Sequence, residues 1–313
     1  MRRITDIKTI SLNIRDVFRV LAGTLQAWRI LGKVKPDVVF LKGGFVGVPI
    51  GLMAALRRVP IVTHDSDILP GLANQLISRW ARIHATALPP EFYAYPSSKA
   101  IQVGVLVEHN YQPVNDQAQK DYKQQLKLPA DAPVLLVTGG SSGAERINNA
   151  VFSIIDELLQ TNPKLWVIHQ VGKGKADAYK GFHHARLRVM EFLPTMYVYT
   201  GAADLIVTRA GANAMAEFGV QGKACIVVPN PDLTGGHQIK NAQRWKEQGA
   251  AKVITEDTLY ETQHGLLATI QDLLANPNER TKIAKNLQKN TITDAAHKLA
   301  QILIEQTGKK AEI

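Results

Sequence analysis

Short, continuously apolar runs alternate with helical segments along most of the chain. These runs span residues 37–41, 61–64, 83–88 and 101–105 in the first half, and 134–138, 165–170, 187–192, 205–208, 225–229 and 252–255 in the second. A run without polar alternation is typical of a strand that helices cover on both faces. Strands that alternate with helices predict parallel sheets built from α/β units.

The beginning of the chain follows a helical pattern instead. Between residues 12 and 33, apolar side chains recur at steps of four and three, which places them on one helix face. These side chains are Ile14, Phe18, Leu21, Leu25 and Trp28. Basic residues flank this apolar stripe at Arg15, Arg19, Arg29 and Lys33. Two interpretations remain open for the stripe: docking on an anionic membrane surface, or ordinary packing against the core.

A length of 313 residues suits two domains better than one. The polar stretch 108–132 is the expected boundary, because a new α/β series opens at Val134. We therefore expect an N-terminal domain over residues 1–128 and a C-terminal domain over 129–290. Residues 291–313 contain an amphipathic helix over 294–306, which we expect to pack back on the first domain. Two doubly wound domains facing across a cleft would place a ligand at the carboxyl ends of their strands.

The net charge of +10 favours an anionic partner, and residues 1–35 carry eight basic residues against two acidic ones. No zinc-finger spacing or RNA-binding aromatic signature accompanies this charge, so nucleic acid is not the expected partner. Cys225 is the only cysteine, which points to a reducing compartment. No run reaches the roughly 20 apolar residues of a membrane span, and the start lacks the apolar core of a secretory signal. We expect a cytoplasmic protein.

The most specific motif is Gly-Gly-Ser-Ser-Gly-Ala at residues 139–144, between an apolar strand and a helix. Glycines let the backbone turn tightly and approach an anion, and the helix start offers free N–H groups. The hydroxyl of Ser141 adds a donor. The alternative is a simple tight turn between a strand and a helix.

Two further motifs follow strands in the second half. Residues 209–217 read Arg-Ala-Gly-Ala-Asn-Ala-Met-Ala-Glu, so small residues open a helix and Glu217 lies about two turns into it. A carboxylate there could accept both hydroxyls of a ribose, or it could be a solvated helix residue. The third motif is the polar Gly-rich loop 229–242. Gln238 and Asn241 lie three residues apart in it and share a helix face.

The fourth motif lies in the first half, in the segments 42–49, 63–67 and 70–74. The first two each follow a predicted strand, so we expect them at the same edge of the sheet. His64 and Asp65 are candidates for acid–base chemistry, although a lone histidine is more often structural. Asp65-Ser66-Asp67 also allows a divalent-metal interpretation, which is the weaker one.

In this order, the four motifs resemble the glycosyltransferase family that adds N-acetylglucosamine to undecaprenyl-pyrophosphoryl-N-acetylmuramyl-pentapeptide in peptidoglycan synthesis. Residues 43–46 are similar to the family's Gly-Gly-Tyr-Val, and residues 64–67 stand at its His-Glu-Gln-Asn. Residues 139–144 with Asn148 match Gly-Gly-Ser-Gln-Gly-Ala and its asparagine. Residues 209–217, Gln238 and Asn241 match the donor-binding block. The likeness runs from about residue 37 to the C-terminal helix.

The resemblance implies a fold of the GT-B type, two Rossmann-like domains, here with an incomplete N-terminal domain. It implies that the second domain binds UDP-N-acetylglucosamine, with Glu217 at the ribose, Ser141 and residues 212–216 near the diphosphate, Gln238 at the sugar and the backbone of Leu193 at the uracil. His64 and Asp65 would be catalytic, and neither metal nor cofactor is required. The full set of expected substrate-binding residues is Phe45, Asp67, Asn74, Ser141, Asn148, Leu193, Arg209, Ala212, Asn213, Ala214, Met215, Ala216, Glu217, Gln238 and Asn241.

The resemblance also implies an undecaprenyl-linked acceptor and a peripheral position on the inner face of the cell membrane. The chain departs from the family pattern at its start, where the family's Gly-rich loop ending in histidine has no counterpart. Asp67 replaces an asparagine, and Glu108 replaces an arginine. Two alternatives therefore stay open: a non-catalytic or split-subunit UDP-sugar-binding protein, and a related transferase that uses another lipid acceptor.

Overall fold

The computed structural model describes residues 7–308, with side chains from Arg19 onward except that of Thr234. The chain divides into two compact units. The first comprises Met1–Gly104 with Asp294–Ile313, and the second comprises Val105–Thr293. The division at residue 104 puts the predicted boundary near residue 128 inside the second unit, and it groups the C-terminal helix with the first.

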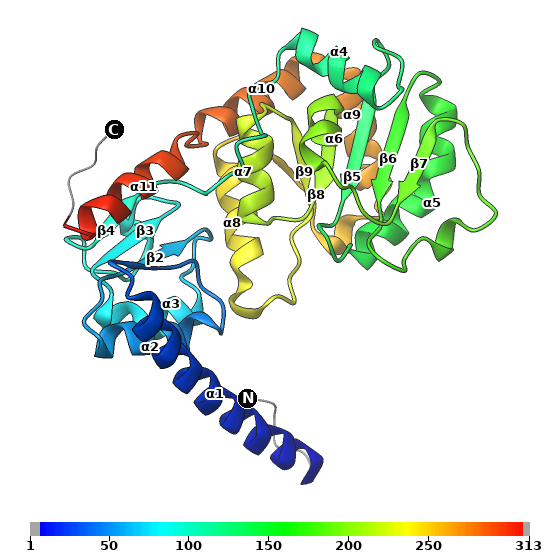
Figure 1. Ribbon diagram of the computed structural model, residues 1–313. Helices are drawn as coiled ribbons and strands as arrows, with labels where there is room; N and C mark the ends of the chain where they lie inside the picture. The colour runs from blue at the N-terminus through cyan, green and yellow to red at the C-terminus, as the bar shows by residue number, and fades with distance from the viewer. Residues whose placement is uncertain (1–6, 309–313) are drawn as a thin grey trace. The chain divides into compact units, whose positions relative to one another are not determined.

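The first unit contains a parallel four-stranded sheet in the order β1-β2-β3-β4 (Figure 1). Its strands are β1 (Val39–Leu41), β2 (Ile61–Asp65), β3 (Ile83–Thr86) and β4 (Ala100–Gln102). Its helices are α1 (Ile7–Val34), α2 (Gly47–Leu56), α3 (Leu72–Ile77) and α11 (Ala295–Gln306), with 3-10 turns at Ser78–Trp80 and Pro90–Phe92. The core of this unit joins Leu31 of α1 to Leu41 and Ile61 of the sheet and to Ile77 of α3.

The second unit is a six-stranded parallel sheet in the order β10-β9-β8-β5-β6-β7. Its strands are β5 (Val134–Thr138), β6 (Trp166–Gln170), β7 (Leu187–Met190), β8 (Leu205–Thr208), β9 (Cys225–Val227) and β10 (Lys252–Val253). Its helices are α4 (Asp116–Gln125), α5 (Glu145–Thr161), α6 (Met196–Ala202), α7 (Ala212–Val220), α8 (His237–Glu247), α9 (Leu266–Ala275) and α10 (Pro277–Lys289), with 3-10 turns at Asp177–Tyr179, Thr234–Gly236 and Glu256–Thr258.

The continuous apolar run of β5 is explained by its two covered faces. Leu135 and Val137 belong to a core cluster with residues of α5 and α9. Val134 and Leu136 belong to a separate cluster with residues of α6, α7 and α8. Because successive strand residues point to opposite faces, a strand with helices on both sides needs an apolar residue at every position.

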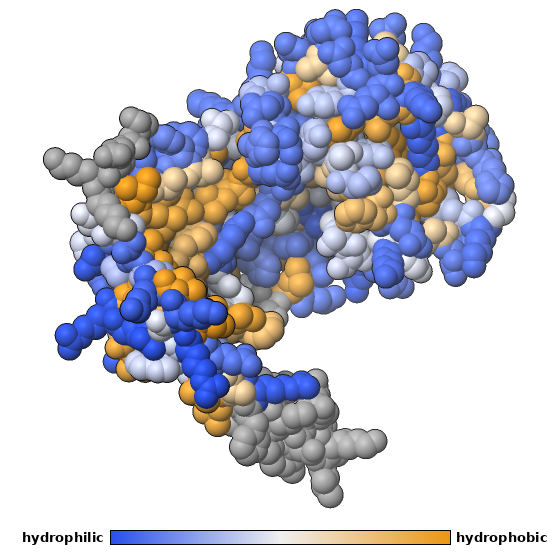
Figure 2. All heavy atoms as spheres, viewed as in Figure 1, coloured by the Kyte–Doolittle hydropathy of each residue, from blue (hydrophilic) through white to orange (hydrophobic). Residues whose placement is uncertain are grey.

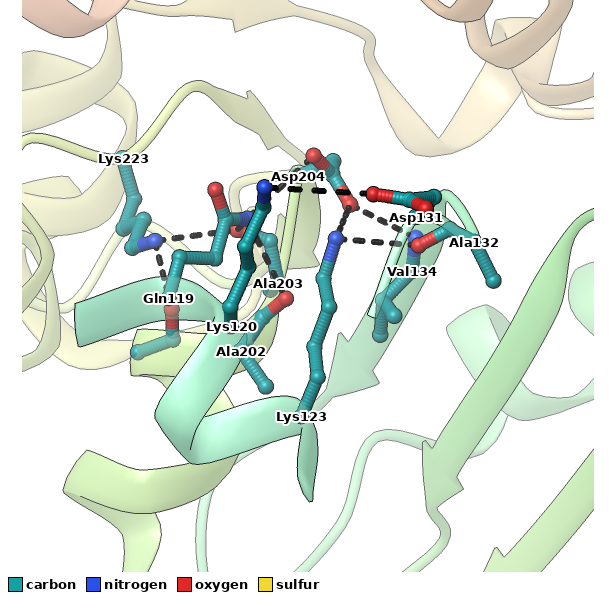
Figure 3. Close-up of polar contacts among 11 residues, drawn as sticks. Gln119, Lys120, Lys123, Asp131, Ala132, Val134, Ala202, Ala203, Asp204 and Lys223 are labelled. Atoms are coloured by element: carbon teal, nitrogen blue, oxygen red, sulfur yellow. Dashed lines mark hydrogen bonds and ion pairs between the residues drawn. The ribbon is translucent and has the colours of Figure 1, made fainter. Parts of the chain in front are cut away.

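A partly buried ion pair fixes helix α4 to the amino-terminal edge of this sheet (Figure 3). The ammonium of Lys123 donates to Oδ2 of Asp204 and to the carbonyl of Ala132, each at 2.9 Å. The same Asp204 oxygen accepts the Val134 N–H at 2.8 Å, so one carboxylate joins α4 to the starts of β5 and β8. Gln119 adds a hydrogen bond to the Ala203 carbonyl at 3.0 Å. The polar segment expected to be a domain boundary is therefore anchored to the second unit.

Candidate active site

The carboxyl ends of β5 and β8 form the centre of the candidate site in the second unit. These strands are neighbours, with Thr138 paired to Thr208, and the chain winds outward from them in opposite directions. Such a reversal of strand order leaves a crevice where ligands of open α/β sheets bind. The Gly-rich turn 139–144 follows β5 and the small-residue segment 209–211 follows β8, so the sheet brings the first two predicted motifs together.

The Gly-rich turn needs its glycines for two different reasons. Gly140 and Gly143 have φ of +80° and +69°, which disfavours other residues. A Cβ on Gly143 would in addition lie 1.9 Å from the carbonyl oxygen of Val171, whereas one on Gly140 would meet nothing within 4 Å. The turn therefore packs tightly against the end of β6 on one side, while Ser141 at its tip is exposed.

A buried hydrogen-bond chain holds this turn in place. Asn148 on α5 donates to the Val171 carbonyl at 2.8 Å, and its Oδ1 lies 3.1 Å from Nε2 of His169. An amide oxygen only accepts, so Nε2 carries the hydrogen and Nδ1 accepts from the Tyr179 hydroxyl at 2.8 Å. Burial lowers the pKa of His169 to about 3, so the ring is neutral. Asn148, predicted as a ligand contact, is buried and supports the turn; the motifs gave no signal for His169 or Tyr179.

Helix α7 begins directly after β8 and presents the second motif. Its first residue follows Gly211, and no side chain caps its free N–H groups. Met215 and Ala216 are buried, as is Ala212, while Asn213 is exposed. Contacts from this segment to an anion would therefore come from the backbone N–H groups at the helix start.

Two other residues of this motif take up different positions. Ala214 is partly buried, and Glu217 is half-buried two turns into α7. Burial first, then the charge of Glu217 and a side-chain hydrogen bond to it, raise the pKa of Tyr111. The charge of Glu217 thus acts on Tyr111, a residue that none of the four motifs contains.

Arg209 pairs with two groups of the protein. Its guanidinium donates to the Val228 carbonyl at 3.1 Å and pairs with Oε1 of Glu256 at 2.6 Å. The second oxygen of Glu256 lies 2.6 Å from the guanidinium of Arg146 on α5. The buried Glu256 thereby joins the end of β8 to the start of α5. Arg209, predicted to bind substrate, therefore also links these elements.

The third motif forms the loop after β9 and the start of α8. Oε1 of Gln238 accepts the Asn230 N–H at 2.9 Å, and Nδ2 of Asn241 donates to the Ala210 carbonyl at 3.2 Å. Both predicted contact residues therefore form hydrogen bonds to neighbouring loops. Leu193, expected to meet the uracil, is buried just past β7, next to the exposed Phe192.

The first unit holds the remaining predicted residues at the end of β2. Oδ1 of Asp65 accepts the Gly71 N–H at 3.0 Å and Nδ2 of Asn74 at 2.9 Å. Its Oδ2 accepts the Tyr95 hydroxyl at 2.8 Å. The buried Asp65 carboxylate accepts three hydrogen bonds and thereby orders the 65–74 loop. Nδ2 of Asn74 adds a further hydrogen bond within this loop, to the His64 carbonyl at 2.9 Å.

His64 is only 1% exposed, and its Nε2 lies 2.9 Å from the carbonyl of Gly104. Because a carbonyl only accepts, Nε2 carries the hydrogen, which leaves Nδ1 as the atom able to take a proton. The hydroxyl of Ser66 lies 3.5 Å from that Nδ1. Burial is the largest influence on the pKa of His64 and lowers it, so the neutral form of the ring dominates at neutral pH.

Phe45 and Asp67 complete the predicted set in this unit. Phe45 follows the Gly43–Gly44 turn, where both φ values are positive, and its side chain is 88% exposed. The backbone carbonyl of Asp67 accepts the Tyr93 hydroxyl at 3.0 Å. Among residues 19–308 with described side chains, no group of three His, Cys, Asp or Glu residues is placed to hold a metal ion.

Two parallel α/β units, with a glycine turn and an acidic helix residue at the switch point of the second, define a nucleotide-sugar-dependent protein of the GT-B class. The sequence model of the glycosyltransferase family 28 C-terminal domain matches residues 134–299, and that of the family 28 N-terminal domain matches residues 6–86. The chain belongs to glycosyltransferase family 28, which confirms the predicted fold class and the resemblance.

Several curated relatives share one name. They are UDP-N-acetylglucosamine–N-acetylmuramyl-(pentapeptide) pyrophosphoryl-undecaprenol N-acetylglucosamine transferases. That of Lachnospira eligens is 34% identical over 93% of this chain and 79% of its own length. That of Geobacillus kaustophilus is 35% identical over 93% of this chain and 79% of its own length.

Solved structures agree with this family. The crystal structure of Acinetobacter baumannii MurG matches with a TM-score of 0.71 at 27% identity, covering 92% of this chain and 79% of that one. UDP-GlcNAc 2-epimerase of Neisseria meningitidis, bound to UDP-GlcNAc, matches with a TM-score of 0.63 at 16% identity, covering 97% and 84%. At that identity the second likeness shows the fold alone.

Proposed function

We propose that this protein transfers N-acetylglucosamine from UDP-N-acetylglucosamine to undecaprenyl-pyrophosphoryl-N-acetylmuramyl-pentapeptide. The observation that carries the proposal is the switch point of the second unit, where the Gly-rich turn after β5 lies beside the segment that leads into α7. This arrangement suits a diphosphate, and it occurs in a chain whose curated relatives carry that activity in their name.

In the donor site, the N–H groups at the start of α7 and the hydroxyl of Ser141 would bind the diphosphate. Glu217 would accept the hydroxyls of the ribose, and Nε2 of Gln238 would donate to the sugar. The backbone at Leu193 would meet the uracil. As the bond between the anomeric carbon and the diphosphate breaks, UDP leaves with the bonding electrons, and the helix-start N–H groups stabilise the negative charge that develops on it.

The acceptor hydroxyl would attack the anomeric carbon from the opposite side, which inverts its configuration, and its proton must pass to a base. We assign that proton to Nδ1 of His64, directly or through a water molecule, because Nε2 is committed to Gly104. Asp65 acts on this site by ordering the 65–74 loop. In this proposal, two residues would contact the acceptor: Phe45, which is exposed on its glycine turn, and Asp67.

We also propose that the first unit docks on the anionic inner surface of the cell membrane. On α1, Leu21, Leu25 and Trp28 are 59%, 51% and 38% exposed, while Ala27 and Leu31 supply the buried face. Ile14 and Phe18 of the predicted stripe lie outside the described side chains. Basic residues flank the apolar ones on this helix, and Figure 2 shows hydrophobic side chains beside hydrophilic ones on the surface of this unit. No helix within residues 7–308 has the length and apolarity to cross a bilayer.

Incorporation of labelled N-acetylglucosamine into a lipid-pyrophosphate acceptor tests the transferase activity. We expect product with UDP-N-acetylglucosamine and little with UDP-glucose. Glu217→Ala should lower kcat/KM on the order of 100-fold, because it removes charged hydrogen bonds to the ribose. Binding of the donor without any transfer would instead support the non-catalytic alternative, and transfer only to another lipid would support the related transferase.

Cosedimentation with vesicles tests the docking surface. The wild type should bind vesicles of phosphatidylglycerol and phosphatidylethanolamine more than vesicles of phosphatidylcholine, and added salt should weaken this binding. Leu21→Asp with Leu25→Asp should abolish it, while Tyr260→Asp in the second unit, a change at another exposed side chain, should not. Equal binding by all three proteins would refute the docking proposal.

A further inference from the structure

The loop that follows β6 reads Val-Gly-Lys-Gly-Lys at residues 171–175. None of the four motifs includes this loop, and the donor site described above does not use it. In the sheet, β6 lies between β5 and β7. Because parallel strands end at the same edge of a sheet, this loop lies between the turn after β5 and the segment after β7. It therefore lies between the parts of the site assigned to the diphosphate and to the uracil.

The loop 171–175 packs directly against the Gly-rich turn. Gly172 has a φ of +92°, and a Cβ on it would lie 2.6 Å from the carbonyl oxygen of Ser142. A Cβ on Gly143 would in turn lie 1.9 Å from the carbonyl oxygen of Val171. The two backbones can approach this closely because each carries a glycine at the contact. The loop thus has a fixed position relative to the turn.

Lys175 places a positive charge at this contact. Its Nζ donates to the Ser142 carbonyl at 2.9 Å, and its side chain is exposed. Ser142 directly follows Ser141, whose hydroxyl is assigned to the diphosphate. An ammonium group has three N–H donors, so the bond to Ser142 leaves two of them for a ligand. Among the side chains that the structure describes, no carboxylate lies within ion-pair distance of this ammonium.

Two arginines beside the switch point are already paired with carboxylates. Arg146 and Arg209 each lie 2.6 Å from an oxygen of Glu256, and Arg146 also lies 3.9 Å from Asp232. The two positive and two negative charges of this group sum to zero. A UDP-sugar carries about one negative charge on each phosphate, and a helix start supplies only about half a positive charge. A further cation close to the diphosphate would therefore improve the charge balance of the donor site.

We propose that Lys175 binds the diphosphate of the nucleotide sugar through its ammonium group. This inference rests on the proposed function, in which the Gly-rich turn and the start of α7 bind the diphosphate. The Ser142 carbonyl holds the ammonium at the turn, and the remaining N–H groups donate to phosphate oxygens. Hydrogen bonds between two charged groups are stronger than those between neutral ones. As UDP leaves with the bonding electrons, its negative charge grows, so the same contact also stabilises the leaving group.

Calorimetric titration of the full-length protein with UDP, at low salt and with added sodium chloride, tests this contact. Lys175→Met keeps an aliphatic side chain and removes the ammonium. Lys173→Met is the matched control, because it removes the same charge from another exposed position of the same loop. Uridine lacks the diphosphate and reports on the rest of the site; ligand-observed NMR measures its weaker binding. Thermal melting checks that each variant is folded.

We expect Lys175→Met to weaken UDP binding about 10-fold at low salt, the size of a hydrogen bond between charged groups. Added salt should reduce this difference from wild type. The uridine affinity of Lys175→Met and the UDP affinity of Lys173→Met should both stay within about 3-fold of wild type.

Three results would overturn the inference: equal weakening of UDP and uridine by Lys175→Met, equal weakening of UDP by the two substitutions, or wild-type UDP affinity in Lys175→Met. The first would reduce Lys175 to a structural role, and the second would assign the effect to the charge of the whole loop. In each case, UDP binding by the wild type that is lost in Glu217→Ala keeps the proposed function intact. Absence of UDP binding by the folded wild-type protein would refute the proposed function and this inference with it.

Discussion

The hydroxyl of Tyr95 donates a 2.8 Å hydrogen bond to Oδ2 of Asp65, across thirty positions of sequence. The ring of Tyr95 is also stacked on His84, with centroids 3.8 Å apart and planes 2° from parallel. This pair joins the end of β2 to the segment before β4. The carboxylate of Asp65, which the sequence suggests as an acid–base group, therefore anchors the 65–74 loop.

Removing this hydroxyl should destabilise the first unit. Tyr95→Phe leaves the stacked ring in place but deprives a buried carboxylate of one donor. We expect the free energy of unfolding to fall by about 1.5–3 kcal/mol, as for other hydrogen bonds to charged groups. Urea denaturation measures it. Tyr260→Phe, at an exposed tyrosine, should stay within about 0.5 kcal/mol of wild type, and equal stability of the two variants would contradict the anchoring role.

Alanine substitutions at two glycines of the Gly-rich turn should destabilise the protein to different extents. Gly140→Ala places a methyl group in open space, so its cost is that of the positive φ alone, about 1–2 kcal/mol. Gly143→Ala has the same φ cost and also drives the methyl group into the Val171 carbonyl, which adds about 1–3 kcal/mol. Thermal melting and donor affinity should both rank Gly143→Ala as the more damaging. The reverse order would show that the turn does not pack on β6 as described.

Asn148 should stabilise the protein through its hydrogen bonds to two buried groups. Asn148→Ala leaves the Val171 carbonyl and Nε2 of His169 buried without their partner. We expect a loss of about 2–4 kcal/mol in unfolding free energy, together with weaker donor binding as the turn loosens. The neighbouring Asn149 is exposed on the same helix, so Asn149→Ala provides the control in both measurements. A similar effect from both substitutions would argue against the buried chain.

Much of this architecture could be predicted from sequence, because continuous apolar runs followed by glycine turns are typical of parallel strands in α/β units. The helix predicted at 12–33 is α1 (Ile7–Val34), and the helix predicted at 294–306 is α11 (Ala295–Gln306). The roles of individual polar residues were harder to predict from the sequence. Asn148, Arg209 and Asn241 have the residue types of ligand contacts, yet each is committed to a carbonyl or carboxylate far away in sequence. Periodicity carries no information about such distant partners.

Three buried histidines should make stability depend on pH. Burial lowers the pKa of His64, His84 and His169, the last to about 3. Below the unfolded value of about 6.5, the unfolded chain therefore binds protons that the folded chain does not. The stability that these rings contribute is complete above that pH and is lost as the pH falls toward the folded values.

The experiment for this dependence compares unfolding free energies between pH 7 and pH 5, above the range where most carboxylates titrate. Each such histidine adds a slope of up to about 1.4 kcal/mol per pH unit. His169→Gln should remove one histidine's share of the slope, whereas His109→Gln at an exposed position should leave the slope unchanged. A His169→Gln profile parallel to wild type would contradict the assignment of a buried, neutral His169.

The nucleotide-sugar site at the β5–β8 switch point is best tested by calorimetric titration of the full-length protein with UDP-N-acetylglucosamine, using UDP-glucose for comparison. We predict saturable binding of UDP-N-acetylglucosamine, weaker binding of UDP-glucose, and loss of affinity on the order of 100-fold in Glu217→Ala. Absence of binding by the folded wild-type protein, or full affinity in Glu217→Ala, would contradict the placement of a nucleotide-sugar site between the Gly-rich turn and α7.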